Sequence, residues 1–72
     1  MSTPDIRVQF GDRIRALRLK RGWTQVKMAD FLAMDRSYLS EIETGKKDPS
    51  LTMLKSIAEG LSMTLSKLID GL

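Results

Sequence analysis

The pattern that most constrains the fold is a helix start signal that occurs four times between residues 23 and 68. In each case a residue that commonly caps helices follows one apolar residue and precedes another by four positions. The four sets are Trp23-Thr24-Met28, Met34-Asp35-Leu39, Pro49-Ser50-Leu54 and Met63-Thr64-Leu68. The capping side chain accepts a hydrogen bond from an early backbone amide, and the apolar pair fixes the direction of the chain into the helix. The repeated signal therefore predicts four short helices.

These start signals, together with the end signals between them, predict helices over residues 25–32, 36–44, 51–60 and 65–70. A longer helix is expected before them, because apolar residues recur at helical spacing in Ile6, Phe10, Ile14 and Leu17. We place its start near Thr3, with Pro4 at the first helical position and Asp5 in the first turn. A start nearer Gly11 is the alternative, since glycine weakens a helix interior. Gly22 is expected to end this helix in a left-handed conformation.

The sequence contains no convincing strand pattern, so we expect an all-α, compact five-helix bundle that forms one domain over residues 1–72. Hydrophobic residues make up 42% of the chain, which is enough for a core. The expected core consists of Phe10, Ile14, Leu17, Met28, Ala29, Leu32, Leu39, Ile42, Leu51, Leu54, Ile57, Ala58, Leu61 and Leu65. Ala29 is small and lies in the middle of its helix, so we expect the next helix to cross closely there.

Several classes of function are disfavoured by composition. The chain has no cysteine and no histidine, which removes disulfides, thiolate and imidazole metal ligands and the commonest general base. It also lacks a convergent carboxylate cluster, so we expect no enzyme activity, no metal and no cofactor. No apolar run approaches the roughly 20 residues that span a bilayer. The N-terminal residues lack an apolar signal core, and we expect the protein in a reducing cytoplasm.

The predicted helix from residue 36 has features suited to DNA. The net charge of +3 is a weak signal, but the segment DRSYLSEIET turns Leu39 and Ile42 inward and leaves a polar outer face. That face consists of Arg36, Ser37, Ser40 and Glu41, with Tyr38 at its edge. A helix of this size fits the major groove, where an arginine fork can bind guanine O6 and N7. The alternative is that Arg36 and Glu41 are ordinary solvated charges on a helix.

Other residues are candidates for phosphate contacts or for structural roles. Gln25 begins the second predicted helix, where its amide and free backbone amides can bind phosphate, although it could equally be a neutral exposed residue. Thr24 is primarily a cap, and its phosphate contact is secondary. Lys46 and Lys47 follow Gly45 and are expected to contact phosphates unless they form a solvated loop. Arg18 and Glu43 are expected to form an interhelical ion pair. Trp23 and Tyr38 could stack on nucleic acid or fill apolar gaps. For Trp23 we favour its role in the helix start signal, and for Tyr38 both roles stay open.

Residues Gly11 to Ile69 resemble the lambda-repressor-like helix-turn-helix family, also called the Cro/XRE family. The matching elements are Arg15-x-x-Arg18, Gly22-Trp23-Thr24-Gln25, Ala29, the block from Ser40 to Lys46, Pro49 and Leu65-x-x-Leu68. The resemblance implies a five-helix fold, an Arg18–Glu43 ion pair and binding of operator DNA as a dimer. It implies base-edge contacts from Arg36, Ser37, Ser40 and Glu41, and a phosphate or first-base contact from Gln25. Ala33 departs from the family, which often has glycine there, so a left-handed turn would be strained by about 1 kcal/mol.

The extended first helix makes the sequence most similar to controller proteins of restriction–modification systems, and regulators from phages or mobile elements are almost as similar. We therefore expect a sequence-specific regulator of transcription that acts on double-stranded DNA, with RNA polymerase left open as a further partner. The alternative is an antitoxin-like module that binds another protein and regulates its own gene. The expected homodimer contact consists of Leu65, Leu68, Ile69 and Leu72. In a second interpretation, Leu65 and Leu68 only close the core of the monomer.

Overall fold

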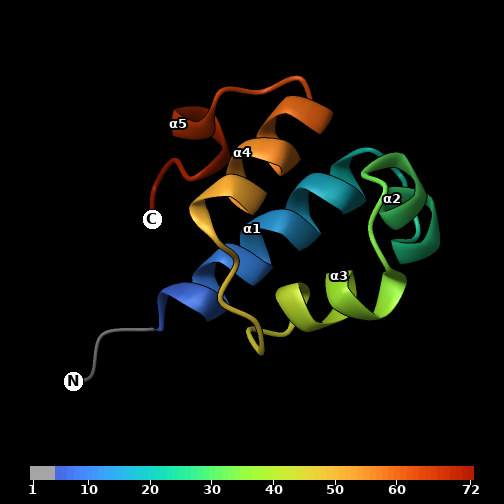
Figure 1. Ribbon diagram of the computed structural model, residues 1–72, viewed down its shortest axis with the longest axis horizontal. Coiled ribbons are helices and arrows are strands. Elements are labelled where there is room, and N and C mark those ends of the chain that lie inside the picture. The colour runs from blue at the N-terminus through green and yellow to red at the C-terminus, as the bar shows by residue number, and fades with distance from the viewer. Residues whose placement is uncertain (1–4) are drawn as a thin grey trace.

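The computed structural model describes residues 5–72, which contain five helices and no strand. The helices are α1 (Ile6–Lys20), α2 (Gln25–Phe31), α3 (Arg36–Glu43), α4 (Leu51–Gly60) and α5 (Leu65–Leu68). Figure 1 shows α1 through the middle of the molecule, with α3 and α2 on one side of it and α4 and α5 on the other. The all-α, five-helix fold predicted from the sequence is confirmed.

All four predicted start signals cap helices. Thr24, Asp35, Ser50 and Thr64 each precede a helix and accept a hydrogen bond from an amide two or three residues later, at 2.8–3.1 Å. Asp5 caps α1 in the same way, accepting from the amide of Arg7 at 2.9 Å. Because Asp5 is the cap, α1 begins at Ile6. The expectation that Asp5 lies in the first turn is therefore wrong, and so is the alternative start near Gly11. Thr3 and Pro4 lie outside the described residues.

The ends of the helices follow the expected positions with small differences. Gly22 has the expected left-handed backbone, with φ of +70°. In α2 and α3 the last predicted residues, Leu32 and Thr44, are caps beyond the helix end. The predicted fifth helix is two residues too long, because the amide of Asp70 bonds to the carbonyl of Lys67, three residues back, in a turn that follows α5.

Close contact between α1 and α3 depends on Gly11. A Cβ added to this residue would lie against the backbone carbonyl oxygen of Ile42 and 2.7 Å from that of Glu43. Only the missing side chain lets the two helices approach so closely. Gly11 is therefore a packing residue inside α1. The close packing that it permits outweighs its poor helix propensity.

The core contains residues from all five helices. Its buried hydrophobic residues are Phe10, Ile14, Met28, Ala29, Leu39, Ile42, Ile57, Ala58, Leu61 and Leu68. Four other predicted core residues, Leu17, Leu32, Leu54 and Leu65, are partly buried at its edge. Leu51 was placed in the core wrongly, since it occupies the first position of α4 and is 72% exposed. Leu68 is completely buried, so the interpretation in which it closes the monomer core is the correct one.

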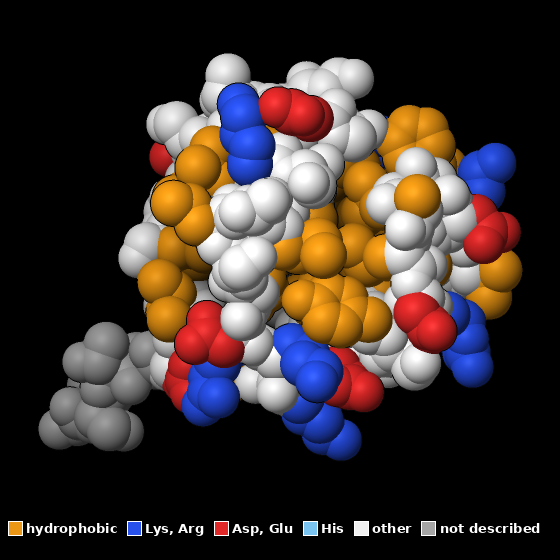
Figure 2. Space-filling model, in the orientation of Figure 1, with side chains coloured by type: hydrophobic (Ala, Val, Ile, Leu, Met, Phe, Trp, Pro, Cys, Tyr) orange, Lys and Arg blue, Asp and Glu red, His pale blue; other side chains and the backbone are white. Residues whose placement is uncertain are grey.

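The surface mixes charge and exposed apolar groups. In the orientation of Figure 1, Figure 2 shows basic and acidic side chains interspersed along the lower edge of the molecule, with hydrophobic side chains exposed in the middle of this face and at its sides. Among residues 5–72, no helix is both long enough and apolar enough to cross a membrane. The same residues contain no cluster of three or more side chains suited to hold a metal ion.

Candidate nucleic-acid interface

The outer side of α3 is polar because its inner side is fully used by the core. Leu39 and Ile42 are 0% and 1% exposed, and Glu43 beside them is buried as well. Arg36 and Ser37 are exposed in the first turn of α3, while Ser40 and Glu41 are half-buried further along. The face predicted from the spacing of the apolar residues is thus present, with the basic residue at the N-terminal end.

The first turn of α3 is organised by Asp35. Its carboxylate accepts from the amide of Ser37 at 2.8 Å and from the hydroxyl of Ser37 at 2.6 Å. These two bonds lower the pKa of Asp35. The hydroxyl hydrogen of Ser37 is therefore engaged within the protein, and its oxygen lone pairs remain to accept from a base amino group or a water molecule.

Glu41 and Lys47 form an ion pair that is not predicted from the sequence. The ammonium nitrogen of Lys47 lies 3.3 Å from Oε2 of Glu41, and both side chains are about half exposed. The signal was available, since a turn at Gly45 folds the chain back toward the last turn of α3. Because exposed pairs contribute little free energy, Lys47 can exchange this carboxylate for a phosphate at small cost.

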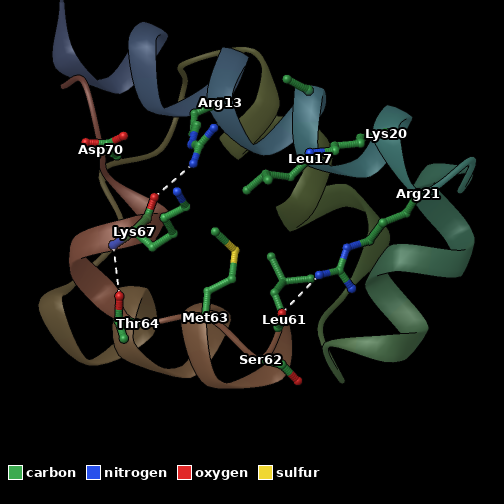
Figure 3. Close-up of a pocket in the computed structure, with 11 residues that line it drawn as sticks. Arg13, Leu17, Lys20, Arg21, Leu61, Ser62, Met63, Thr64, Lys67 and Asp70 are labelled. Atoms are coloured by element: carbon green, nitrogen blue, oxygen red, sulfur yellow. Dashed lines mark hydrogen bonds between the residues drawn. The ribbon is translucent and has the colours of Figure 1, made fainter.

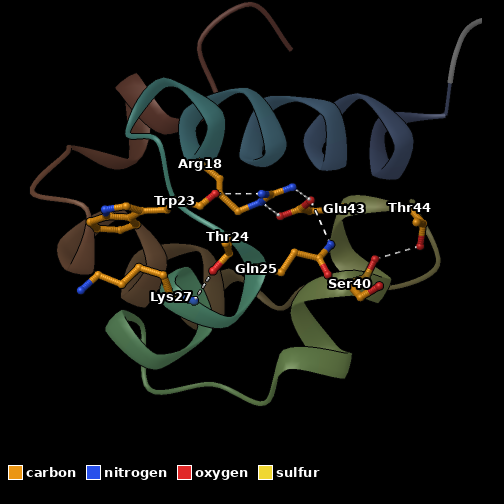
Figure 4. A network of polar contacts seen from close by, with 8 residues as sticks. All are labelled: Arg18, Trp23, Thr24, Gln25, Lys27, Ser40, Glu43 and Thr44. Atoms are coloured by element: carbon orange, nitrogen blue, oxygen red, sulfur yellow. Dashed lines mark hydrogen bonds and ion pairs between the residues drawn. The ribbon is translucent and has the colours of Figure 1, made fainter.

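Arg18, Glu43 and Gln25 form one network that connects α1, α2 and α3 (Figure 4). Arg18 donates to both carboxylate oxygens of Glu43, at 2.8 and 3.0 Å, and its third nitrogen donates to the carbonyl of Trp23 at 2.9 Å. Gln25 donates to Oε1 of Glu43 at 3.2 Å. The hydrogen bonds to Glu43 raise the pKa of Arg18 against the opposing effect of burial. The ion pair expected between Arg18 and Glu43 is present, and it positions the start of α2 against the end of α3.

Gln25 was expected at phosphate, and its contact with Glu43 was not foreseen. The contact uses one amide hydrogen of Gln25 and leaves the second one for a ligand. Thr24, next to it, accepts from the amide of Lys27 at 3.1 Å. The two side chains lie together at the N-terminal end of α2 (Figure 4). The structure thus brings a side-chain amide and a hydroxyl to a helix end whose free amides favour anions.

The two aromatic residues that could stack on nucleic acid pack against the core. Trp23 and Tyr38 are both partly buried there. Trp23 also lies 4.9 Å from Phe31, centroid to centroid, and the guanidinium carbon of Arg21 is 5.3 Å from its ring. These contacts support the role of Trp23 in the start signal of α2.

The basic residues after α3 lie on the loop that follows Gly45. Gly45 adopts φ of +76°, and Lys46 and Lys47 beyond it are exposed. The amide of Lys46 bonds to the carbonyl of Glu41 at 2.8 Å, which holds the loop against the end of α3. Both lysines are thus attached to the same structural unit as the outer face of α3.

The residues expected at a dimer contact separate into two groups. Leu68 is in the core and Leu65 is partly buried beside it. Ile69 and Leu72 are 37% and 39% exposed. They border a small apolar groove of about 200 Å³ that is also lined by Ile6, Phe10, Pro49 and Leu54. An apolar surface therefore remains at the end of α5 after the monomer core is complete.

The arrangement matches that of known regulators. Residues 14–68 match the helix-turn-helix family model. The chain is 39% identical over 69 residues to the control protein C.MunI of a Mycoplasma species, covering 94% of this chain and 93% of that protein. It is also 39% identical over 59 residues to the immunity repressor of Bacillus phage phi105, covering 82% of this chain but only 41% of the repressor.

A solved structure supports the same assignment. The restriction-modification controller protein C.AhdI from Aeromonas hydrophila superposes with a TM-score of 0.78 at 34% identity, covering 86% of this chain and 94% of that one. The family model, the relatives and the solved structure all indicate a helix-turn-helix fold over most of the chain. The chain belongs to the helix-turn-helix family of DNA-binding transcriptional regulators.

Proposed function

We propose that the protein binds an operator in double-stranded DNA as a homodimer, with α3 of each subunit in the major groove of one half-site. The observation that carries this proposal is the division of α3 into a fully buried side and a polar outer side that begins with exposed Arg36. The network around Glu43 holds α3 against α1 and α2, so the outer side is presented by a rigid unit. Rigid presentation favours recognition because less conformational entropy is lost on binding.

In this arrangement the base edges contact the outer face of α3. Arg36 donates two hydrogen bonds to a guanine, and Ser37 accepts from an exposed base amino group because its own hydrogen is engaged by Asp35. Ser40 contributes a hydroxyl in the next turn. Glu41 accepts from a cytosine amino group and opposes bases that present only acceptors there.

The phosphate backbone contacts the helix pair α2–α3 at two places, the start of α2 and the loop after α3. Gln25 and Thr24 bind a phosphate at the start of α2 through the second amide hydrogen and the hydroxyl. Lys46 and Lys47 bind the backbone beyond the end of α3, and Lys47 leaves Glu41 to do so. Tyr38 contributes its phenol at the edge of the same face. These contacts fix the position of α3 without selecting sequence.

The second subunit covers the apolar surface at Ile69 and Leu72, with Leu65 at its margin. A twofold dimer places two copies of α3 on the same side of the duplex, about 34–36 Å apart, one helical turn of DNA. The protein then recognises an operator with two related half-sites and works where bacterial DNA is, in the cytoplasm.

Selection of bound sites from a random pool of double-stranded DNA tests this function. We expect the wild-type protein to enrich two inverted half-sites with centres one helical turn apart. Enrichment of a single half-site would contradict the dimer, and no enrichment at low ionic strength would contradict sequence-specific DNA binding.

Sedimentation at micromolar concentration tests the dimer contact separately. Ile69→Asp should convert the dimer to a monomer, because it places a charge in the apolar contact. Leu19→Asp is a matched control, since Leu19 is 58% exposed on α1 and is not among the residues that line the groove at Ile69. A monomeric wild-type protein, both free and on DNA, would contradict the proposed assembly.

A further inference from the structure

A surface cleft of about 1010 Å³ lies between α1 and the segment that links α4 to α5 (Figure 3). Its α1 side includes Arg13, Leu17 and Lys20, which recur at spacings of four and three residues and so share one face of the helix. The contacts of α1 with α3 come from a different face, which carries Gly11 and Arg18. The cleft is therefore separate from the surface proposed to bind DNA.

The cleft has a strong excess of positive charge. Four basic side chains line it, Arg13, Lys20, Arg21 and Lys67, against one carboxylate, Asp70, which leaves a net charge of +3. Within residues 5–72, none of these four cations belongs to an ion pair. A concave surface with uncompensated positive charge attracts acidic ligands.

The two arginines are held in place by backbone carbonyls. Arg13 donates to the carbonyls of Leu68 and Lys67, at 3.1 and 2.8 Å, and Arg21 donates to the carbonyl of Leu61 at 2.9 Å. Each guanidinium has five N–H donors, so both keep donors for a ligand. These bonds orient the two side chains and leave their full charges in place.

The charges occur at two ends, with apolar groups between them. Figure 3 shows Arg13 and Lys67 at one end, where Asp70 also lies. Lys20 and Arg21 form the other end. The side chains of Leu17 and Met63 extend into the space between these ends (Figure 3). A compact anion such as a single phosphate could contact one end only. An extended ligand with carboxylates at both ends and an apolar group in the middle matches the whole cleft.

We infer that this cleft binds an acidic peptide segment of a partner protein, in which apolar residues lie between carboxylates. The carboxylates bind the two basic ends and the apolar residues cover Leu17 and Met63. Because the site lies on another face of α1 from α3, the peptide and DNA bind independently. The inference thus stands apart from the proposed operator binding and can fail or succeed without it.

Fluorescence anisotropy with labelled peptides tests the site at about 0.15 M ionic strength, where non-specific attraction is largely screened. The probe is a hexapeptide of two glutamates, two leucines and two glutamates. A second peptide of equal charge carries glycine in place of leucine. We expect the leucine peptide to bind about tenfold more tightly or better, because the glycine peptide cannot cover the apolar centre. Equal affinity for the two peptides would overturn the inference.

Charge-reversal variants locate the binding. Lys20→Glu with Lys67→Glu should weaken the leucine peptide by about tenfold or more, since both ends lose attraction and gain repulsion. The matched control, Lys27→Glu with Lys55→Glu, makes the same change of net charge on lysines outside the cleft. Neither Lys20 nor Lys67 makes a side-chain bond within the described residues, and circular dichroism checks that both variants are folded.

Equal weakening in the two double variants would overturn the inference, because it would show attraction to net charge alone. Competition distinguishes other occupants. ATP or a random DNA duplex could displace the peptide, and the binding of that competitor could be lost only in the cleft variant. Both results together would show that the cleft binds phosphate groups and that the assignment to a peptide is wrong. DNA binding by the cleft variant, measured alongside, separates this result from any failure of operator recognition.

Discussion

Arg18 donates two hydrogen bonds to the two carboxylate oxygens of Glu43, and this pair joins α1 to the last turn of α3. The side chains are 11% and 3% exposed, so the charges are largely removed from water. Such a pair adds little net free energy to folding, yet the loss of one partner leaves an uncompensated buried charge. The pair matters for function because it positions Gln25, whose amide donates a hydrogen bond to the same carboxylate of Glu43.

Glu43→Gln should lower the free energy of unfolding by about 3 kcal/mol or more, since it leaves the guanidinium of Arg18 without a counter-charge. Urea denaturation measures the change. Glu59→Gln is the matched control, because the pair of Glu59 with Lys55 is exposed, and the expected loss is under about 1 kcal/mol. A Glu43→Gln effect as small as that of the control would contradict the structural role of the pair. Should Glu43→Gln fail to fold, Arg18→Met combined with Glu43→Leu should restore stability.

Gly11→Ala should destabilise the protein by about 1–3 kcal/mol, although alanine is the better helix former. The added Cβ would meet backbone carbonyls of α3 that cannot rotate away. Gly60→Ala provides the comparison, because its Cβ would meet only the end of the Leu32 side chain, at 2.6 Å, which can move. Thermal unfolding of both variants measures the difference. Equal melting temperatures would contradict the close contact of α1 with α3.

Ala33→Gly should stabilise the protein by up to about 1 kcal/mol, because Ala33 has φ of +55° in the turn between α2 and α3. The same change at Ala16, an exposed position inside α1, should destabilise by about 1 kcal/mol. Denaturant midpoints of the two variants measure these opposite effects. Loss of stability in Ala33→Gly would mean that the turn is not left-handed in solution.

Replacing Lys46 and Lys47 together with alanine should weaken binding to all DNA sequences alike. Each phosphate contact contributes about 0.9 to the slope of log affinity against log salt, so the slope should fall by about 2 for each bound subunit. Anisotropy titrations at several salt concentrations measure it. Lys20→Ala with Lys67→Ala removes the same charge from the cleft on another face of α1 and should leave the slope nearly unchanged. Equal slopes in the two variants would exclude phosphate contacts by Lys46 and Lys47.

The sequence predicted the helices well because their boundaries are set by local chemistry. Four helices begin directly after their own capping residues, Thr24, Asp35, Ser50 and Thr64. The helix from Leu51 to Gly60 was predicted to the residue. The polar outer side of α3 followed from the spacing of Leu39 and Ile42.

Features that depend on tertiary packing were harder to predict from the sequence. Gly11 looked like a weak point in a helix, since nothing in the local sequence shows that a neighbouring backbone passes beside it. Leu51 was predicted in the core and is exposed. Leu68 was predicted at the dimer contact, with the monomer core as the alternative, and it is buried in the core. Both residues fit an apolar helical pattern, and only packing decides which of them is covered. Among the candidate site residues, the bond from Gln25 to Glu43 and the pair of Glu41 with Lys47 join segments that meet only in the folded chain.

The most direct measurement of the central claim compares the DNA sites selected from a random duplex pool by the wild-type protein, by Arg36→Ala and by Lys67→Ala. If the outer side of α3 contacts bases in the major groove, Arg36→Ala should lose base preference at one position of each half-site, at about 1–3 kcal/mol, and keep the others. Lys67→Ala should select the wild-type sites. Identical sites for Arg36→Ala and the wild type would contradict the role of Arg36, and a wild-type protein that selects no sequence would contradict the account as a whole.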